Sequence, residues 1–175
     1  PANKFHDRLL ELDLEATIAA DNTDPNRPLS LYFHLPFCAS RCWYCGCTTI
    51  ITRRQDWATT YLAELKKEIA LIASRIDLNR PVEQLHFGGG TPTFFSALRE
   101  LGEVLRSTFR FAPDAECSIE IDPRVVSPEQ VQVLADLGIN RASLGIQDTN
   151  TEVQEAIHRV QPSDLNRRVV ELLRA

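Results

Sequence analysis

Four strand-like runs, each followed by a helix-length segment, constrain the fold of this chain more than any other feature of its sequence. The runs lie at residues Leu31 to Leu35, Gln84 to Phe87, Cys117 to Ile121 and Ala142 to Ile146. The helical segments that follow them span roughly residues 57–75, 96–109, 128–137, and 151–158 with 163–174. Connections of this length favour parallel strands joined by right-handed crossovers. The rhythm therefore predicts an α/β fold built from four βα units.

Each strand-like run has one apolar face and one polar face. In the first run, Leu31, Phe33 and Leu35 alternate with Tyr32 and His34, and the three later runs repeat this pattern. A parallel sheet covered by helices on both faces would instead read as a nearly continuous apolar run. An antiparallel sheet with one face in water is an alternative, although helix-length connections favour parallel pairing. We expect a curved sheet or open barrel whose polar side lines a cavity at the C-terminal ends of the strands.

Four of the five cysteines fall within ten residues, directly after the first strand-like run. They are Cys38, Cys42, Cys45 and Cys47, with the spacing C-x3-C-x2-C-x-C. A disulfide framework spreads its cysteines to staple distant loops, so this crowding indicates a metal centre. Structural zinc sites with four thiolates usually use two separated C-x2-C pairs. Three thiolates at this compact spacing suit a [4Fe-4S] cluster with one open iron, and structural zinc is the main rival.

Composition excludes several classes of function. With 175 residues, 43% hydrophobic and 25% charged, the chain has the make-up of a globular protein with a core. A formal charge of −5 disfavours a broad nucleic-acid surface. No apolar run approaches the roughly 20 residues that span a bilayer, and no leader-peptide pattern is present. We therefore expect a cytoplasmic protein without nucleic-acid or membrane partners.

The first 28 residues differ from the rest of the chain. A leucine-rich amphipathic stretch with Leu9, Leu10, Leu12 and Leu14 leads into a polar segment from Asp21 to Pro28. Residues 1–28 are thus predicted to form an N-terminal helix and linker, and residues 29–175 the βα units. The sequence contains no methionine and stops inside a helical pattern, which predicts that it is part of a longer protein.

Three further motifs coincide with the later strand-like runs. Residues 84–93 read Q-L-H-F-G-G-G-T-P-T, residues 116–123 read E-C-S-I-E-I-D-P, and residues 141–148 read R-A-S-L-G-I-Q-D. A triple glycine lets backbone approach a ligand closely, and it is not the spaced G-x-G-x-x-G of dinucleotide binders. Together with the segment from Tyr32 to Cys47, these motifs resemble radical S-adenosylmethionine (SAM) enzymes. Within that superfamily they resemble the oxygen-independent coproporphyrinogen III oxidases.

The resemblance implies an incomplete parallel (β/α)6 barrel of the radical SAM type, of which this chain covers about four βα units. It also implies a [4Fe-4S] cluster held by Cys38, Cys42 and Cys45, together with two molecules of SAM. The residues that it assigns to SAM are Tyr32, Tyr44, Gly89, Gly90, Thr91, Glu120, Gln147 and Arg159, with Gln147, Arg159 and part of the glycine segment serving the second molecule. Without the resemblance, Arg159 would be read as a solvated arginine at a helix end. The candidate catalytic residues are Cys47 and His34.

The activity that the resemblance implies is an oxidoreductase reaction of anaerobic haem biosynthesis. Two propionate side chains of coproporphyrinogen III would lose their carboxyl groups and become the vinyl groups of protoporphyrinogen IX. The expected partners are this tetrapyrrole and an electron-donor protein such as a flavodoxin or ferredoxin. The protein itself is expected to be a monomer. A haem chaperone of the same superfamily is the nearest alternative, but it usually lacks the fourth cysteine, which is Cys47 here. Two further candidates are a related radical SAM methyltransferase and a structural zinc module.

Overall fold

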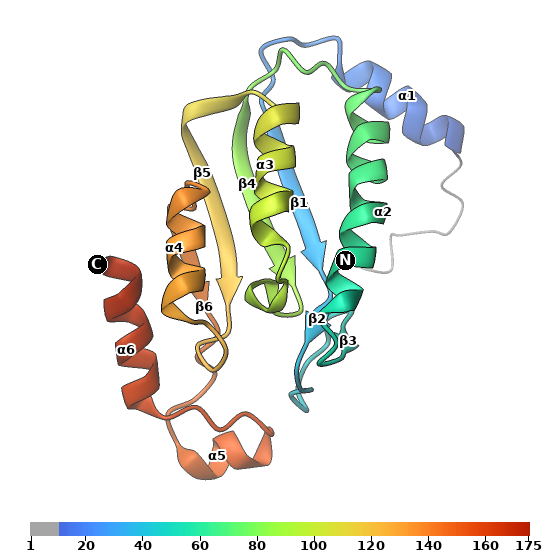
Figure 1. Ribbon diagram of the computed structural model, residues 1–175. Coiled ribbons are helices and arrows are strands. Elements are labelled where there is room, and N and C mark those ends of the chain that lie inside the picture. The colour runs from blue at the N-terminus through green and yellow to red at the C-terminus, as the bar shows by residue number, and fades with distance from the viewer. Residues whose placement is uncertain (1–10) are drawn as a thin grey trace.

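The computed structural model describes residues 11–175 (Figure 1). Its first helix, α1, spans Glu11–Asp21 and is followed by a turn-rich stretch that leads into the sheet. The predicted helix residues Leu9 and Leu10 lie outside the described residues. The division of the chain at residue 28 stays a prediction.

Four long strands form one parallel sheet in the order β1-β4-β5-β6. They are β1 (Leu29–Leu35), β4 (Val82–Gly89), β5 (Phe111–Ile121) and β6 (Arg141–Leu144). Each of these strands therefore lies beside the long strand that precedes it in the chain. This arrangement confirms the predicted parallel α/β fold and excludes the antiparallel alternative. A second, two-stranded parallel sheet pairs β2 (Phe37–Cys38) with β3 (Ile50–Ile51), and the sequence pattern did not predict it.

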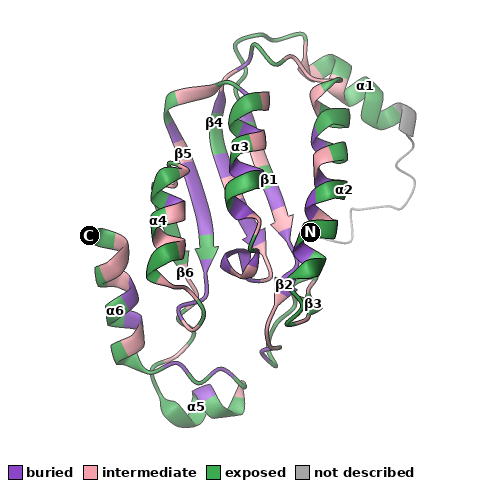
Figure 2. Cartoon of the chain, in the orientation of Figure 1, coloured by how far each residue is buried: buried purple, intermediate pink, exposed green. Residues whose placement is uncertain are grey.

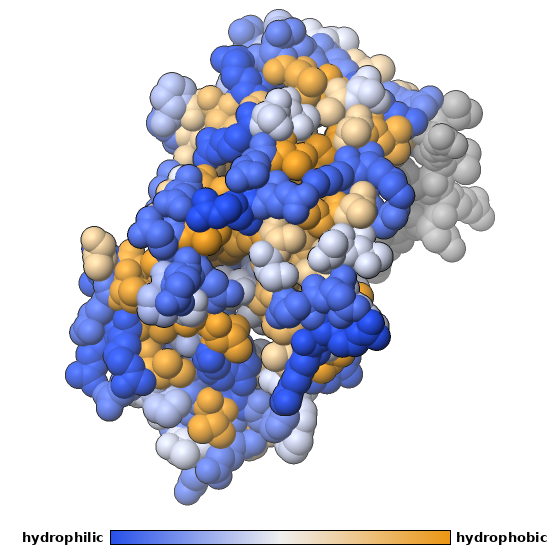
Figure 3. Space-filling model, in the orientation of Figure 1, coloured by the Kyte–Doolittle hydropathy of each residue, from blue (hydrophilic) through white to orange (hydrophobic). Residues whose placement is uncertain are grey.

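Helices cover one face of the sheet (Figure 1). On that face lie α2 (Asp56–Ala73), α3 (Leu98–Thr108) and α4 (Pro128–Asp136), and α6 (Ser163–Arg174) packs beside α4. The 3-10 helix η2 (Pro92–Phe94) follows β4, and the short helix α5 (Thr151–Ala156) lies beyond the C-terminal end of β6. No described helix is long and apolar enough to cross a membrane. On the helix-covered face, hydrophilic residues are interspersed with smaller apolar patches (Figure 3).

The core lies between the apolar face of the sheet and the helices (Figure 2). Leu35, Phe87 and Ile119 project from the three longer strands and are almost completely buried. Leu101 and Leu105 of α3 pack in the same cluster. Burying a side chain of this size stabilises the fold by roughly 1.5–3 kcal/mol. The apolar residues of these strands thus face the core, whereas the polar residues that alternate with them lie on the opposite face of the sheet.

The fourth strand departs from the expectation. The predicted run continued to Ile146, but β6 ends at Leu144. Its predicted apolar face is not buried, because Ala142 is exposed and Ile146 is 41% exposed. Within the described residues β6 pairs only with β5, so its second edge has no neighbouring strand to shield these side chains.

Candidate active site

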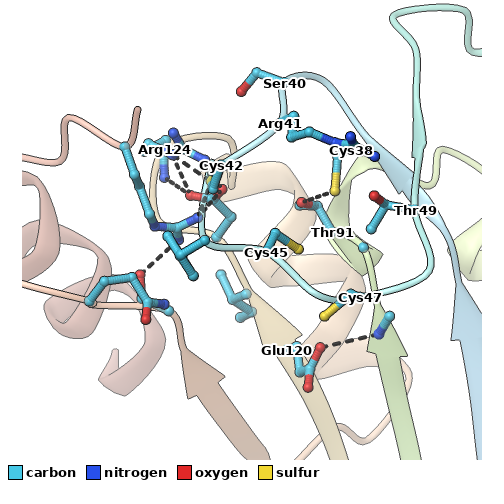
Figure 4. Close-up of a pocket in the computed structure, with 18 of the residues that line it drawn as sticks. Cys38, Ser40, Arg41, Cys42, Cys45, Cys47, Thr49, Thr91, Glu120 and Arg124 are labelled. Atoms are coloured by element: carbon cyan, nitrogen blue, oxygen red, sulfur yellow. Dashed lines mark hydrogen bonds and ion pairs between the residues drawn. The ribbon is translucent and has the colours of Figure 1, made fainter. Parts of the chain in front are cut away.

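A cavity of about 350 Å³ opens at the C-terminal ends of the four long strands (Figure 4). Its walls are the cysteine loop after β1, the glycine-rich turn that ends β4, the ends of β5 and β6, and the side chain of Arg159. Parallel α/β folds bind their ligands at this end of the strands, and the volume lies in the range of small-molecule sites. The cavity is therefore where the predicted site should be.

All four clustered thiols line this cavity, and each is a free cysteine. The loop that carries them is closed by β2 and β3, where the Ile50 amide donates to Pro36 O (2.7 Å) and the Thr52 amide donates to Cys38 O (2.9 Å). Inside the loop, the Cys45 amide donates to Cys42 O (3.1 Å). This folding-back turns the sulfur atoms toward the cavity (Figure 4).

The thiols lie close enough to influence one another's ionisation. Burial raises the pKa of the Cys38 thiol, a hydrogen bond with Thr91 (3.4 Å) opposes the rise, and the neighbouring thiols Cys45 and Cys42 add to it. Burial also raises the pKa of Cys47, and its contact with Cys45 contributes to the same shift. Such a group of thiols becomes a set of thiolates most readily when a cation binds it.

The donor set fits a [4Fe-4S] cluster. Cys38, Cys42 and Cys45 present three soft sulfur donors to one cavity, and cysteine thiolates are the ligands of such clusters. Among residues 11–175, no three His, Cys, Asp or Glu side chains converge closely enough to hold a single metal ion. A cluster does not require that convergence, because each thiolate binds a different iron atom.

The glycine-rich turn packs directly against the cysteine loop. The Gly90 amide donates to Leu35 O (2.9 Å), and the Thr91 amide donates to Phe37 O (2.8 Å). A Cβ atom at Gly90 would lie 2.7 Å from Phe37 O, which is closer than side chains approach. Gly89 has a φ of +116°, a conformation that favours glycine. Contact with the protein's own backbone therefore explains Gly90.

Glu120 projects from β5 into the cavity, on the polar face that the alternation predicted. Its carboxylate accepts a hydrogen bond from the Gly89 amide (3.2 Å), so it joins β5 to the glycine-rich turn. The thiol of Cys47 lies near this carboxylate (Figure 4). An exposed carboxylate in the cavity wall is suited to holding a cationic amine of a ligand.

Arg159 lies inside the cavity wall, and the interpretation of it as a solvated residue is wrong. His158 has a φ of +55° after the end of α5, and the Arg159 amide donates back to Gln154 O (2.8 Å). This left-handed turn reverses the chain and buries Arg159 to 7% exposure. Its Nη2 donates to Gly145 O (2.8 Å) and its Nη1 to Asp122 (3.2 Å), whereas its buried Nε has no hydrogen-bond partner among the described residues.

Two functional candidates that the sequence interpretation missed are Asp122 and Arg124. Burial alone would raise the pKa of Asp122, but hydrogen bonds from Arg124 and the nearby Arg159 charge hold it below its usual value. Arg124 also donates to Cys42 Sγ (3.5 Å). Asp122 could have been found, since it continues the polar face two residues beyond Glu120. Arg124 follows the end of β5 and carries no periodic signal.

Most of the predicted site residues meet at this cavity, and two do not. The cavity is lined by Cys38, Cys42, Tyr44, Cys45, Cys47, Gly89, Gly90, Thr91, Glu120, Gln147 and Arg159. Tyr32 and His34 lie outside its lining, although both project from the polar face of β1. The Tyr32 hydroxyl is hydrogen-bonded to His34 Nδ1 (3.0 Å), and His34 Nε2 donates to Thr48 O (2.8 Å). His34 therefore holds the end of the cysteine loop through its hydrogen bond to the backbone of Thr48.

Comparisons with known proteins agree with this geometry. The sequence profile of the Radical SAM superfamily matches residues 32–175. The oxygen-independent coproporphyrinogen III oxidase of Helicobacter pylori is 45% identical over 99% of this chain and 39% of its own length. The enzyme of that name from Synechocystis is 42% identical over 99% of this chain and 38% of its own length.

A solved structure gives the same result. Coproporphyrinogen III oxidase from Escherichia coli, described as a radical SAM enzyme, superposes with a TM-score of 0.90 and 40% sequence identity. The match covers 99% of this chain and 39% of that chain. The chain thus spans about two fifths of the length of the relatives that it matches.

Proposed function

Because this chain belongs to the radical SAM superfamily, we propose that the protein containing it is an oxygen-independent coproporphyrinogen III oxidase. It would convert two propionate side chains of coproporphyrinogen III to the vinyl groups of protoporphyrinogen IX. The observation that carries this proposal is the single cavity that gathers three cysteines, a glycine-rich turn and Glu120. The names of the relatives, at 42–48% identity, supply the substrate.

Cys38, Cys42 and Cys45 are the residues that would hold the cluster. When bound, the cluster and SAM supply a 5′-deoxyadenosyl radical, which takes one hydrogen atom from a propionate side chain. The propionate would then lose carbon dioxide and pass one electron to an external electron acceptor as its vinyl group forms. The role of this chain is to hold the ligands in place and to exclude water from the cavity.

Glu120 and the backbone of Gly89, Gly90 and Thr91 would hold SAM. Glu120 provides the carboxylate for the SAM amino group, and the exposed ring of Tyr44 provides an apolar wall beside it. Gln147 and Arg159 would hold a second SAM molecule. The unpartnered Nε of Arg159 supports that assignment, because it leaves one buried N–H donor available for a ligand.

Cys47 and His34 would have different roles. Cys47 lines the cavity, where burial raises the pKa of its thiol, and it would act as a proton donor from Sγ. His34 would act by positioning the cysteine loop through its bond to Thr48 O. An electron donor such as a flavodoxin or ferredoxin, a monomeric state and a cytoplasmic location stay predictions.

The test is an anaerobic assay of the full-length protein. After reconstitution with iron and sulfide, it is incubated with SAM, a reductant and coproporphyrinogen III, and both 5′-deoxyadenosine and the vinyl product are followed. We expect both products from the parent and neither from Cys38→Ala. Cys117→Ala is the matched control, since Cys117 is a buried cysteine outside the cavity. A colourless protein that takes up no iron, or vinyl product formed without SAM, would contradict the proposal.

A further inference from the structure

Two guanidinium groups converge on one sulfur atom, that of Cys42. Arg124 Nη2 and Arg159 Nη1 each lie 3.5 Å from Cys42 Sγ and donate hydrogen bonds to it. Cys42 is 8% exposed, the most buried of the four clustered thiols. Among the described residues, the hydrogen-bond partner of Cys38 Sγ is the uncharged hydroxyl of Thr91. Cys42 is therefore set apart from the two remaining candidate ligands by the positive charge beside it.

Asp122 holds both guanidinium groups in this arrangement. Its carboxylate accepts from Arg124 Nε (3.0 Å) and Nη2 (2.7 Å) in a forked contact, and from Arg159 Nη1 (3.2 Å). The Arg124 amide also donates to Asp122 Oδ1 (3.0 Å), which fixes the turn after β5. The three side chains are only 9–20% exposed. A forked, shielded contact of this kind leaves the guanidinium few other orientations.

The contact has a consequence for a cluster bound at Cys42. Reduction adds negative charge to the cluster and its thiolate ligands. N–H donors and positive charge beside a ligand sulfur stabilise that reduced form, so they raise the reduction potential. Arg159 is already proposed to serve a ligand in the cavity. Arg124 uses its guanidinium only on Asp122 and Cys42 among the contacts that the structure describes.

We propose that Arg124 is a positioning residue that donates an N–H···S hydrogen bond to the Cys42 thiolate and thereby raises the reduction potential of the cluster. This inference rests on the proposed function, since it requires a cluster at Cys42. It assigns to Arg124 an effect on the ease of electron uptake. Asp122 contributes by orienting the guanidinium.

The test is a redox titration of the reconstituted full-length protein, followed by electron paramagnetic resonance. Arg124→Met removes the charge and the donor, and we expect its midpoint potential to shift to a more negative value than that of the parent. Arg124→Lys keeps the charge but cannot bond to Asp122 and Cys42 in the same forked manner, so its shift should have the same sign and be smaller. Arg99→Met is the matched control, because Arg99 is paired with Asp136 on the outer surface, and its potential should equal that of the parent.

The iron content of each protein separates the possible failures. A parent that binds no iron contradicts the proposed function itself. A fully loaded Arg124→Met protein with an unchanged potential overturns only the role of Arg124. If that variant binds no iron, the potential of Arg124→Lys decides in the same way. Loss of iron from both variants would show that Arg124 is needed to bind the cluster, and it would overturn the assignment of Arg124 to the reduction potential.

Discussion

Gly90 packs against the cysteine loop and Gly46 lies within it, but a side chain would meet very different surroundings at the two positions. At Gly90 a Cβ atom would lie 2.7 Å from Phe37 O and 2.8 Å from the carbonyl carbon of Pro36, and neither can move without shifting the loop. At Gly46 no atom lies within 4 Å of such a Cβ atom. One glycine is thus required by packing, whereas the other is not.

Gly90→Ala is therefore expected to destabilise the protein by about 1–3 kcal/mol, the usual cost of forcing an extra carbon into a packed site. Its melting temperature should fall by several degrees. The measurement is thermal unfolding of the cluster-free full-length protein, with Gly46→Ala as the matched control. Equal melting temperatures for the two variants would contradict the assigned contact.

Glu120 and Glu116 lie on the same strand and differ in what they face. Glu120 lines the cavity, whereas Glu116 is paired with Arg141 at the exposed edge. Loss of one charge-assisted hydrogen bond costs roughly 1.5–3 kcal/mol, so Glu120→Gln should weaken SAM binding roughly 10- to 100-fold. Equilibrium binding of SAM to the reconstituted protein measures this, and Glu116→Gln should bind like the parent. If Glu120→Gln binds SAM with the affinity of the parent, Glu120 does not hold SAM and the prediction is wrong.

Asp122 makes stability depend on pH in the acid range. Its folded-state pKa is lowered, so the carboxylate contributes stability that is fully present above its ordinary pKa of about 4 and is lost as the pH falls through the lower folded value. Removing one partner of a buried ion pair costs about 3–5 kcal/mol. Asp122→Asn should therefore be less stable than the parent by about that amount at pH 7, and the difference should shrink below pH 4.

Urea unfolding of the cluster-free protein at a series of pH values measures this difference. Asp136→Asn is the control, since its partner Arg99 is exposed, and it should change stability little at any pH. A difference between parent and Asp122→Asn that stays constant down to the lowest pH would rule out the ionised pair.

At the level of elements, the end of α5 is clasped to the cysteine loop. The Trp43 amide donates to Ile157 O (3.0 Å), and His158 Nδ1 donates to Arg41 O (2.8 Å). The rings of Trp43 and His158 are stacked, with centroids 5.3 Å apart, although Trp43 is 71% exposed. These contacts, which we call the clasp, join the loop that carries the thiols to the turn after α5 in which Arg159 is buried.

Trp43→Ala should loosen this clasp. An aromatic pair contributes about 0.5–1.5 kcal/mol, so local opening of the loop should become roughly 2- to 10-fold more frequent. The rate at which Cys42 reacts with an alkylating reagent in the cluster-free protein, followed by mass spectrometry, reports this opening. Trp57→Ala removes another surface indole, 40% exposed, from α2, which does not carry the thiols, and should leave the rate unchanged. An unchanged rate in Trp43→Ala would show that the stacking does not hold the loop.

The sequence predicted the elements whose signal is local. The three longer strands and the helices follow from the alternation and from segment length. The pair β2–β3 was missed because two residues carry no period. The early start of β5 at Phe111 was also missed, since Pro113 and Asp114 disfavour a strand. Pairing with Val82 of β4 overrides that preference, and an irregularity in the register accommodates the intervening residues.

The site residues that lie in continuous motifs were also predictable, whereas those brought together only by folding were not. The motifs identify the cysteine loop, the glycine-rich turn and Glu120, because each is continuous in sequence. The position of Arg159 depends on a left-handed turn at His158, and a residue other than glycine rarely adopts that conformation, so the sequence alone does not predict the turn. The contact of Arg124 with Cys42 joins residues 82 positions apart, and only the folded chain brings them together.

The molecule as a whole has one covered face and one open side. The helices shield the apolar face of the sheet, whereas β6 has no second neighbour among the described residues. The cavity is lined by residues at and after the ends of β1, β4, β5 and β6. Within the described residues, no strand lies beyond β6 to close its other side. A radical in such a cavity would be accessible to water from that side.

We therefore predict that residues 1–175 alone take up iron but form no vinyl product from coproporphyrinogen III. Any 5′-deoxyadenosine that they release should appear without decarboxylation. The same anaerobic assay that tests the function measures both products, with the full-length protein as the positive control. Decarboxylation by the isolated segment would contradict this prediction.

The order of the strands also determines how the site can be assembled. Since each long strand pairs with the long strand before it, the sheet can grow one strand at a time as the ribosome releases the chain. The cysteine loop follows the first of these strands, so its thiols leave the ribosome before Glu120, Asp122 and Arg159 exist to surround them. A cluster could therefore be enclosed only after these later residues have been synthesised, and until then the nascent thiols would be open to oxidants.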